Sequence, residues 1–446
     1  MSRSGFTLIE LMVAMVVGLV AITSVYSLGA AMSKRFYEEQ RLASSQGTSR
    51  VAILELRRDI SRAGLFGSPN GQSEPTCDAT PPTLPKLGGG TELPMGAFQY
   101  YPDADLAVLD PDDLNPGVHA DRLRVLTSLY LTDQLLVHSA SSDGATIVLQ
   151  NGNQAYRRTF SWGQTAGPFT SGQAPTYLTG DLAWDSAWSG ETASWKGIAQ
   201  TGARAFQTGS VLHIETPEGR HFFRSVFAKS GNTENEVRMQ ITPTLPVGTA
   251  CLPGAAEGAT LSPLQWVEYA IVDPFSIVED SANFMDFEGM FFTDLDPSHP
   301  AFALKGTAKD DLLESPNLVL VRRVLDSVSG DVREGSTQVI AEFVSNFQVS
   351  FLLDTKGART APPDLSIAPI TGAGNEDAVN DSPQHVRTVI IELGIRSPLE
   401  DPSIELIPND TKMTRFEVNE EQKGSARVRK MRIEVPVMNV ARRNLL

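Results

Sequence analysis

Three side chains around one short segment are the clearest candidates for metal chemistry in this sequence. His213, Glu215 and His221 flank Thr-Pro-Glu-Gly, and two facing strands there could bring them together on a metal ion. Polar side chains on strands commonly point into water. We therefore predict that these three side chains face solvent, and we expect no metal and no cofactor. None of the six histidines stands in a recognised nucleophile motif. We therefore predict a protein that is not an enzyme.

Two acidic stretches contain enough carboxylates for a calcium site to be considered. Both lack the ordered spacing and the glycine of an EF-hand loop, so we predict solvated acidic loops. Three tryptophans could likewise form a binding platform, but tryptophan in a β-rich protein more often fills the core. The residues concerned are Asp103, Asp105, Asp110, Asp112 and Asp113, then Asp286, Glu288, Asp294 and Asp296, and finally Trp184, Trp188 and Trp195.

The two cysteines, Cys77 and Cys251, allow one disulfide or two buried thiols. The sequence contains no C-x-x-C motif and no Cys/His spacing that suits zinc. A disulfide becomes the expected state if this part of the chain lies outside the cytoplasm.

A single carboxylate inside a long apolar segment is the strongest chemical signal. Residues Phe6 to Ser33 contain no Lys or Arg and one acid, Glu10. The segment is long enough for a membrane-spanning helix, and too long for the apolar core of an ordinary secretory signal, which has about 7 to 15 residues. An acid in hydrocarbon costs roughly 2.5 to 3.5 kcal/mol, and a plain membrane anchor has no use for it. Glu10 therefore needs a partner.

The run Gly5-Phe6-Thr7-Leu8-Ile9-Glu10, after a short basic leader, resembles the prepilin processing motif of type IV pilins and type II secretion pseudopilins. The resemblance implies that a membrane peptidase cuts after Gly5 and that the new N-terminus, Phe6, is methylated. Cleavage creates an α-amine, and a carboxylate one helical turn away, on the same chain or a neighbour, can pair with it. Glu10 would then set the assembly register.

The first 63 residues predict one long helix. The stretch from Lys34 to Ala63 contains no proline, and its apolar residues recur at three- and four-residue steps. A helix from Phe6 to about Ala63 would be roughly 85 to 90 Å long. A glycine-rich stretch from Gly64 to Gly71 ends it.

The rest of the chain predicts short strands, which gives the α+β class. We expect a pilin-like fold: a long protruding N-terminal helix whose C-terminal half packs on an antiparallel β-sheet, with a large β-rich insertion. The expected regions are a prepilin leader (1–5), a transmembrane or filament-core half-helix (6–33), an amphipathic half-helix (34–64), a loop and β-rich inserted region (65–264) and a sheet body (265–446).

The individual strands follow from alternating and β-branched runs. A hairpin is expected from Val211–Glu215 and Arg220–Phe227, and the last strand carries the basic residues Arg427, Arg429, Lys430 and Arg432, which should face water or an acidic patch of a partner. The other expected strands are Arg122–Ser128, Gln134–Ser139, Thr146–Leu149, Gln265–Val272, Asn317–Leu325, Gln338–Leu353, Arg387–Ser397 and Arg427–Val440.

Three further stretches carry a resemblance to the PilW family of minor pilins. Leu56 to Gly67 resembles its signature at the end of the long helix, and Leu318 to Arg323 with Val339 to Leu353 resembles the paired strands of minor pilins. The resemblance implies a subunit that helps prime and cap a type IV pilus and supports adhesion and twitching motility. It implies as partners prepilin peptidase, other minor pilins, the major pilin and a large tip adhesin.

The resemblance also implies a location: the inner membrane with a periplasmic body before assembly, and the pilus tip at the cell surface afterwards. A net charge of -16 disfavours nucleic acid as a partner. Two alternatives stay open from the sequence: a minor pseudopilin of type II secretion, which shares the N-terminal motif, and a carbohydrate-acting or cell-wall-acting protein tethered by a pilin stalk.

Overall fold

The structure is a computed structural model of the whole chain. It describes residues 8–71, 83–86, 90–110, 115, 117–131, 133–150, 205–233, 236–273, 318–333, 335–354, 365–368, 375–397, 415–417 and 425–442. Predictions that fall on other residues, among them Gly5, Phe6, Cys77 and the three tryptophans, lie outside this described part.

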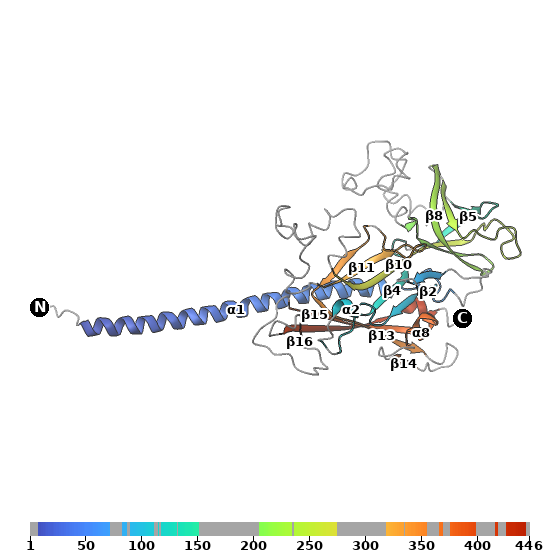
Figure 1. Ribbon diagram of the computed structural model, residues 1–446. Helices are drawn as coiled ribbons and strands as arrows, with labels where there is room; N and C mark the ends of the chain where they lie inside the picture. The colour runs from blue at the N-terminus through green and yellow to red at the C-terminus, as the bar shows by residue number, and fades with distance from the viewer. Residues whose placement is uncertain are drawn as a thin grey trace.

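Helix α1 spans Leu8–Ser61 and contains no proline. Its first part runs out from the β-rich body, and its last part lies among the strands (Figure 1). Ala52, Leu56 and Ile60 recur at four-residue steps and are fully buried in the main core. Beyond the last turn, Gly64 has a φ of 68°, a left-handed conformation that glycine adopts without steric cost.

The end of α1 lies close to the predicted end near Ala63. Within the described residues, no helix combines the length and the apolar character needed to cross a bilayer.

Strand β10 organises the larger of the two main sheets. Its second half pairs antiparallel with β4 on one side and with β11 on the other. The strands of this sheet are β3 (Phe98–Tyr101), β4 (Arg122–Thr127), β5 (Leu135–Ala140), β6 (Thr146–Leu149), β7 (Val211–Glu215), β8 (His221–Thr233), β9 (Glu236–Thr242), β10 (Thr260–Val272), β11 (Val319–Leu325) and β12 (Gln338–Glu342).

The first half of β10 closes a small barrel. Thr260 pairs with Leu136 of β5 and with Glu215 of β7, so the pairings run in a ring, β10-β5-β6-β9-β8-β7-β10, and every neighbouring pair is antiparallel. A second core of buried apolar side chains, Phe206 and Phe222 among them, belongs to this ring. Strands β5 to β9, which lie in the inserted region, therefore form a filled barrel with β10, a strand that also pairs with β4 and β11.

The second main sheet is antiparallel and has the order β14-β13-β15-β17-β16. Its strands are β13 (Val344–Asp354), β14 (Leu365–Ala368), β15 (Val386–Arg396), β16 (Arg415–Phe416) and β17 (Ala426–Pro436). The main core unites the end of α1 with side chains of both sheets, such as Tyr269 from β10 and Ile391 from β15. The end of α1 is thus part of the core of the body.

Short elements complete the fold. They are the hairpin β1 (Thr83–Lys86) and β2 (Gly90–Pro94), the helices α2 (Leu106–Leu109), α8 (Asn375–Asn380) and α9 (Met438–Arg442), and the 3-10 turn η4 (Pro383–His385).

The α+β class with a β-rich insertion agrees with the sequence-based prediction, and the predicted hairpin is confirmed as β7 and β8. Two strand predictions were wrong. The run 338–353 is divided at Phe343, whose φ of 55° turns the chain from one sheet into the other. The last strand ends at Pro436, and α9 occupies the residues up to Arg442. The predicted boundary between insertion and body, 264/265, falls within β10.

Candidate functional site: the apolar helix and its anchor on the body

The first half of α1 is apolar on all sides. Consecutive residues of a helix, such as Leu8 and Ile9, point about 100° apart around its axis, and both of these side chains, like that of Met12, are more than half exposed. The other exposed apolar side chains of this half are Val13, Met15, Val16, Val17, Leu19, Ile22, Val25, Tyr26, Leu28 and Met32. A helix that is apolar all round needs an apolar environment, either lipid or neighbouring helices.

The residues of the processing motif are only partly in the described chain. Gly5 and Phe6 precede the described residues, and the backbone of Glu10 lies in the first turn of α1. Their predicted roles in cleavage, methylation and assembly stay predictions.

At its other end, α1 is fastened to the body by a buried carboxylate. Arg322 on β11 donates from Nε to Oδ2 of Asp59 at 2.6 Å, and the Tyr269 hydroxyl on β10 donates to the same oxygen at 2.8 Å. Asp59 is fully buried, while the Arg322 side chain is 15% exposed. Tyr269 and Arg322 are directly opposite each other in the β10–β11 register. Two neighbouring strands therefore hold one helix side chain.

Burial first, and the Asp59 carboxylate second, raise the pKa of Tyr269 well above its ordinary value, so the phenol stays a donor. Because a buried charge without its partner is costly, this arrangement fixes how far α1 enters the body and how it is rotated.

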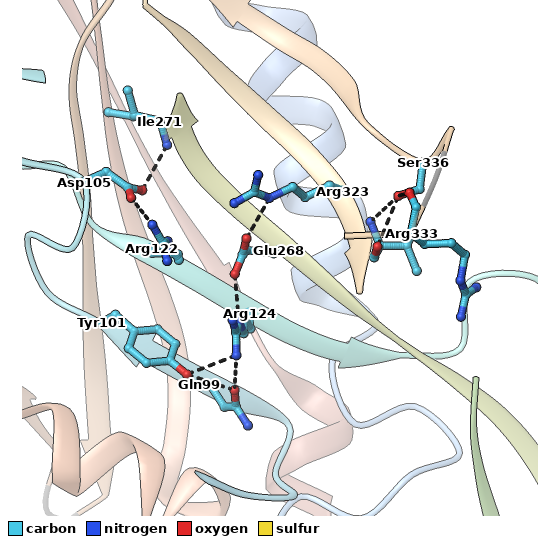
Figure 2. A network of polar contacts seen from close by, with 11 residues as sticks. Gln99, Tyr101, Asp105, Arg122, Arg124, Glu268, Ile271, Arg323, Arg333 and Ser336 are labelled. Atoms are coloured by element: carbon cyan, nitrogen blue, oxygen red, sulfur yellow. Dashed lines mark hydrogen bonds and ion pairs between the residues drawn. The ribbon is translucent and has the colours of Figure 1, made fainter. Parts of the chain in front are cut away.

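The opposite face of the same two strands carries a second buried ionic cluster (Figure 2). Glu268 accepts from Arg124 Nε at 2.8 Å and from Arg323 Nε at 2.7 Å, and it is directly opposite Arg323 in the register. Burial acts to raise the pKa of Glu268, but Arg323 and Arg124 outweigh it and hold that pKa below its ordinary value. An ionised Glu268 thus joins β4, β10 and β11.

The cluster of Figure 2 extends toward β3 and α2. Arg124 donates from Nη1 to the Tyr101 hydroxyl at 3.1 Å and to the Gln99 side-chain oxygen at 3.3 Å. Asp105, just before α2, pairs with Arg122 and accepts from the Ile271 amide at 3.2 Å. These contacts brace the strands that hold Asp59.

Another buried carboxylate, that of Asp121, accepts three hydrogen bonds. Its donors are the amides of Asp103 and Val349, at 2.9 and 2.6 Å, and the Tyr100 hydroxyl at 3.2 Å. Burial raises the pKa of Asp121 to about 6 against the opposing effect of the two amides. The folded protein therefore keeps a proton on Asp121 at pH values where the unfolded chain has lost it.

The pH dependence of stability follows from that shift. The stabilisation from a proton on Asp121 is complete below the ordinary Asp pKa of about 3.9 and is lost as the pH rises through about 6. Between pH 4 and 7 we expect the free energy of unfolding to fall by on the order of 3 kcal/mol from this group. Urea unfolding of the native chain and of Asp121→Asn at several pH values in this range measures how steeply the free energy of unfolding of each protein changes with pH. Identical slopes in the two proteins would contradict the assignment.

The candidate metal ligands form a histidine pair instead. The His213 ring donates from Nδ1 to the Phe66 carbonyl at 2.8 Å, and its Nε2 lies 2.9 Å from Nδ1 of His221. The two rings are stacked and buried, and Glu215 is opposite His221 in the hairpin. Among the described residues, no three potential ligands gather around a metal position. The pair links the barrel to the chain that leaves α1.

The first acidic stretch does not converge on one point within the described residues. Asp103 bonds to His119 at 3.0 Å, Asp105 pairs with Arg122, and Asp110 accepts from the Asn115 amide at 2.8 Å. Asp112, Asp113 and the whole second stretch lie outside the described residues.

Cys251 is disulfide-bonded, and Cys77 lies outside the described residues.

The anchor was not predicted as a site from the sequence, although a signal for it was present. Asp59 occupies the same face as Leu56, Ile60 and Ala63, all of which are buried, so an acid at this position has to find a buried cation. Arg322, in a strand of apolar residues, is that cation.

Comparison with known proteins concerns the N-terminus. Residues 1–26 match the family model described as the prokaryotic N-terminal methylation motif. No curated protein and no solved structure matches the chain. The matched residues include Gly5, Phe6 and Glu10, and the match supports a type IV pilin-like prepilin that prepilin peptidase processes and that has pilin partners. It is consistent with a pilin that is held at the inner membrane and later enters the pilus.

Proposed function

We propose that this chain is a minor pilin of the PilW kind and acts as a non-enzymatic assembly subunit. It helps prime a type IV pilus and caps it as part of a minor-pilin tip complex that supports adhesion and twitching motility. The observation that carries the proposal is a processing motif directly ahead of a helix half that is apolar all round and exposed. The experiment that tests it is deletion of the gene, with pili counted and twitching measured.

The assembly step uses the two ends of α1 differently. Prepilin peptidase cuts after Gly5, and the methylated Phe6 amine pairs with Glu10 of a neighbouring pilin. The apolar half of α1 then packs against the helices of other minor pilins and the major pilin. A pulling force on the long protruding helix reaches the body through Asp59, because that carboxylate is hydrogen-bonded to side chains of β10 and β11.

Before assembly, the segment Phe6 to Ser33 holds the precursor at the inner membrane with the body in the periplasm. This segment contains no charged residue other than Glu10, which suits a place in the bilayer. After assembly the body stands at the pilus tip on the cell surface. The barrel is joined to the rest of the body through β10. In this proposal the barrel is the part of the body that binds a tip adhesin.

A minor pseudopilin of type II secretion is the second candidate, since the processing motif serves both systems. The same deletion strain separates the two. Loss of secreted enzymes with normal pili would assign the chain to secretion, whereas loss of pili with normal secretion is the result we expect.

Replacement of Glu10 by valine should impair incorporation without impairing anchoring or cleavage. The valine variant keeps an apolar helix but has no carboxylate for the neighbouring amine. We expect at least a tenfold loss of the subunit from sheared pilus fractions, measured by immunoblot against the amount in the membrane. Glu10→Asp, which keeps the charge, is the matched control and should be incorporated better than the valine variant. Equal recovery of Glu10→Val and the native chain would refute the pairing.

A further inference from the structure

A short parallel pairing joins the two main sheets directly before β4. The Phe347 amide of β13 donates to the His119 carbonyl at 2.8 Å, and the Asp121 amide donates to the Phe347 carbonyl at 2.9 Å. Ala120 lies opposite Phe347 in this pairing. The chain that enters β4 of the larger sheet is therefore bound to β13 of the five-stranded sheet.

Three side chains that can gain or lose a proton surround this pairing. Asp121 accepts from the Val349 amide of β13 at 2.6 Å and from the Asp103 amide at 2.9 Å, so its carboxyl group contacts β13 and the chain that follows β3. Asp103 accepts from His119 Nδ1 at 3.0 Å and from the Ala120 amide at 3.3 Å. We call Asp103, His119 and Asp121 the clasp.

Other elements bring further titratable groups to the clasp. The Tyr100 hydroxyl of β3 donates to Asp121 at 3.2 Å, and burial, with Asp121 second, keeps the pKa of Tyr100 above its ordinary value. Glu376 of α8 acts on the pKa of Tyr100 in the same direction, and Lys430 of β17 opposes a positive charge on His119. Tyr100 therefore stays protonated, and the clasp residues are the ones that exchange protons with water near neutral pH.

The clasp carries the least net charge in mildly acidic water. The hydrogen bond between them holds the pKa of Asp103 below its ordinary value and raises the pKa of His119 above its ordinary value of 6.5. Burial raises the pKa of Asp121 to about 6. Near pH 5 the clasp therefore holds one carboxylate, one imidazolium and one uncharged carboxyl group. As the pH rises through the pKa values of Asp121 and His119, both protons leave, and two carboxylates remain together without a cation.

The two raised pKa values change stability in the same direction. Those of Asp121 and His119 lie above the values of the unfolded chain, so the stabilisation is complete at low pH and is lost as the pH rises through the folded values. The lowered pKa of Asp103 stabilises the folded chain above the ordinary value of 3.8, and that contribution is lost only as the pH falls.

We propose that the clasp is a pH-sensitive joint between the two sheets, closed in mildly acidic surroundings and opened locally as the pH rises toward 8. Opening separates residues 119–121 from β13, while each sheet keeps its own hydrogen-bonded ladder. The carboxyl group of Asp121 bonds directly to the backbone on both sides of this contact, so its charge acts there first. This inference does not depend on the proposed pilus function, because it rests on contacts within the body.

Hydrogen exchange at single-residue resolution, on the full-length chain in detergent, tests the proposal. The amides of Phe347 and Val349 donate to the 119–121 side, whereas those of Gln348 and Ser350 alternate toward β15. After correction for the intrinsic rates, protection of Phe347 and Val349 should fall by about tenfold or more from pH 5 to pH 8, the loss that the Asp121 shift alone predicts. At pH 8 these two amides should exchange about tenfold faster than Gln348 and Ser350, and 1 M urea should leave their rates unchanged, as for a local opening.

Two variants separate the contributions of the clasp residues. His119→Gln keeps a donor for Asp103 without a positive charge, so protection of Val349 should be several-fold lower than in the native chain at pH 5 and equal to it at pH 8. Asp121→Asn cannot ionise, so its protection should change less with pH than that of the native chain. His138→Gln, at an exposed histidine of β5, is the matched control and should behave like the native chain.

Three results would overturn the proposal. The first is protection of Phe347 and Val349 that does not depend on pH. The second is the same pH dependence in the native chain, His119→Gln and Asp121→Asn. The third is equal protection and equal urea dependence of all four β13 amides, which would show that the contact opens only when the whole body unfolds.

Discussion

Replacement of Gly5 by valine should leave the chain as unprocessed precursor and abolish its incorporation into pili. The peptide bond after Gly5 is the bond at which we propose that prepilin peptidase cuts, and it lies within the motif matched at residues 1–26. A β-branched side chain at this position adds bulk and stiffness directly beside that bond, so the peptidase cannot bring it into its catalytic centre. Intact-mass analysis of the membrane fraction should find Met1 retained in more than nine tenths of the valine variant.

Gly5→Ala is the matched control, because it adds a single methyl group and should be cleaved at a reduced rate. Cells that express Gly5→Val should also lack the subunit in sheared pili. Normal processing together with normal piliation in the valine variant would contradict the assignment of the N-terminus.

Replacement of Asp59 by leucine should have the largest effect on stability. The variant leaves the Arg322 guanidinium and the Tyr269 hydroxyl without their common acceptor inside the body. Removing one partner of a buried ion pair costs about 3 to 5 kcal/mol, and we expect the lower end because Arg322 is partly exposed and can reach water. Urea unfolding of the full-length chain in detergent, followed by tryptophan fluorescence, measures the change.

An exposed ion pair of the same helix provides the control. Glu55 and Arg58 are 3.5 Å apart and lie at the surface, so Glu55→Gln should change the free energy of unfolding by less than about 0.5 kcal/mol. The double variant Asp59→Leu with Arg322→Met should recover part of the loss, since no uncompensated charge remains. If Asp59→Leu is no more destabilising than Glu55→Gln, the anchor does not hold the helix.

The sequence predicted best what is local. The helical period up to Ala63 and the turn sequence between the strands of the β7–β8 hairpin are set by neighbouring residues. Helix α1 and strand β7 lie within two residues of their predicted bounds, whereas β8 continues to Thr233 instead of ending at Phe227. The last strand was extended too far because alternation continues through Val440, although Pro436 already ends the pairing.

Contacts between distant residues were beyond prediction from one sequence. Asp59 and Arg322 are 263 positions apart, and no local pattern specifies that pair among the many acids and arginines. Closure of the barrel depends on Thr260 pairing with Leu136 of β5, which lies more than 100 residues earlier in the chain. The run 338–353 is divided at Phe343 because its first part pairs with β11 and its second part pairs with β15 of the other sheet. Neither partner strand is close to the run in a way that its local pattern could reveal.

The central claim is that this chain is matured as a pilin subunit, and the N-terminus of the mature polypeptide tests it most directly. Mass spectrometry of the chain purified from sheared pili should find a polypeptide that starts at Phe6 and carries a methyl group on its amine. A mature chain that retains Met1, or one that starts near residue 30, would contradict the claim.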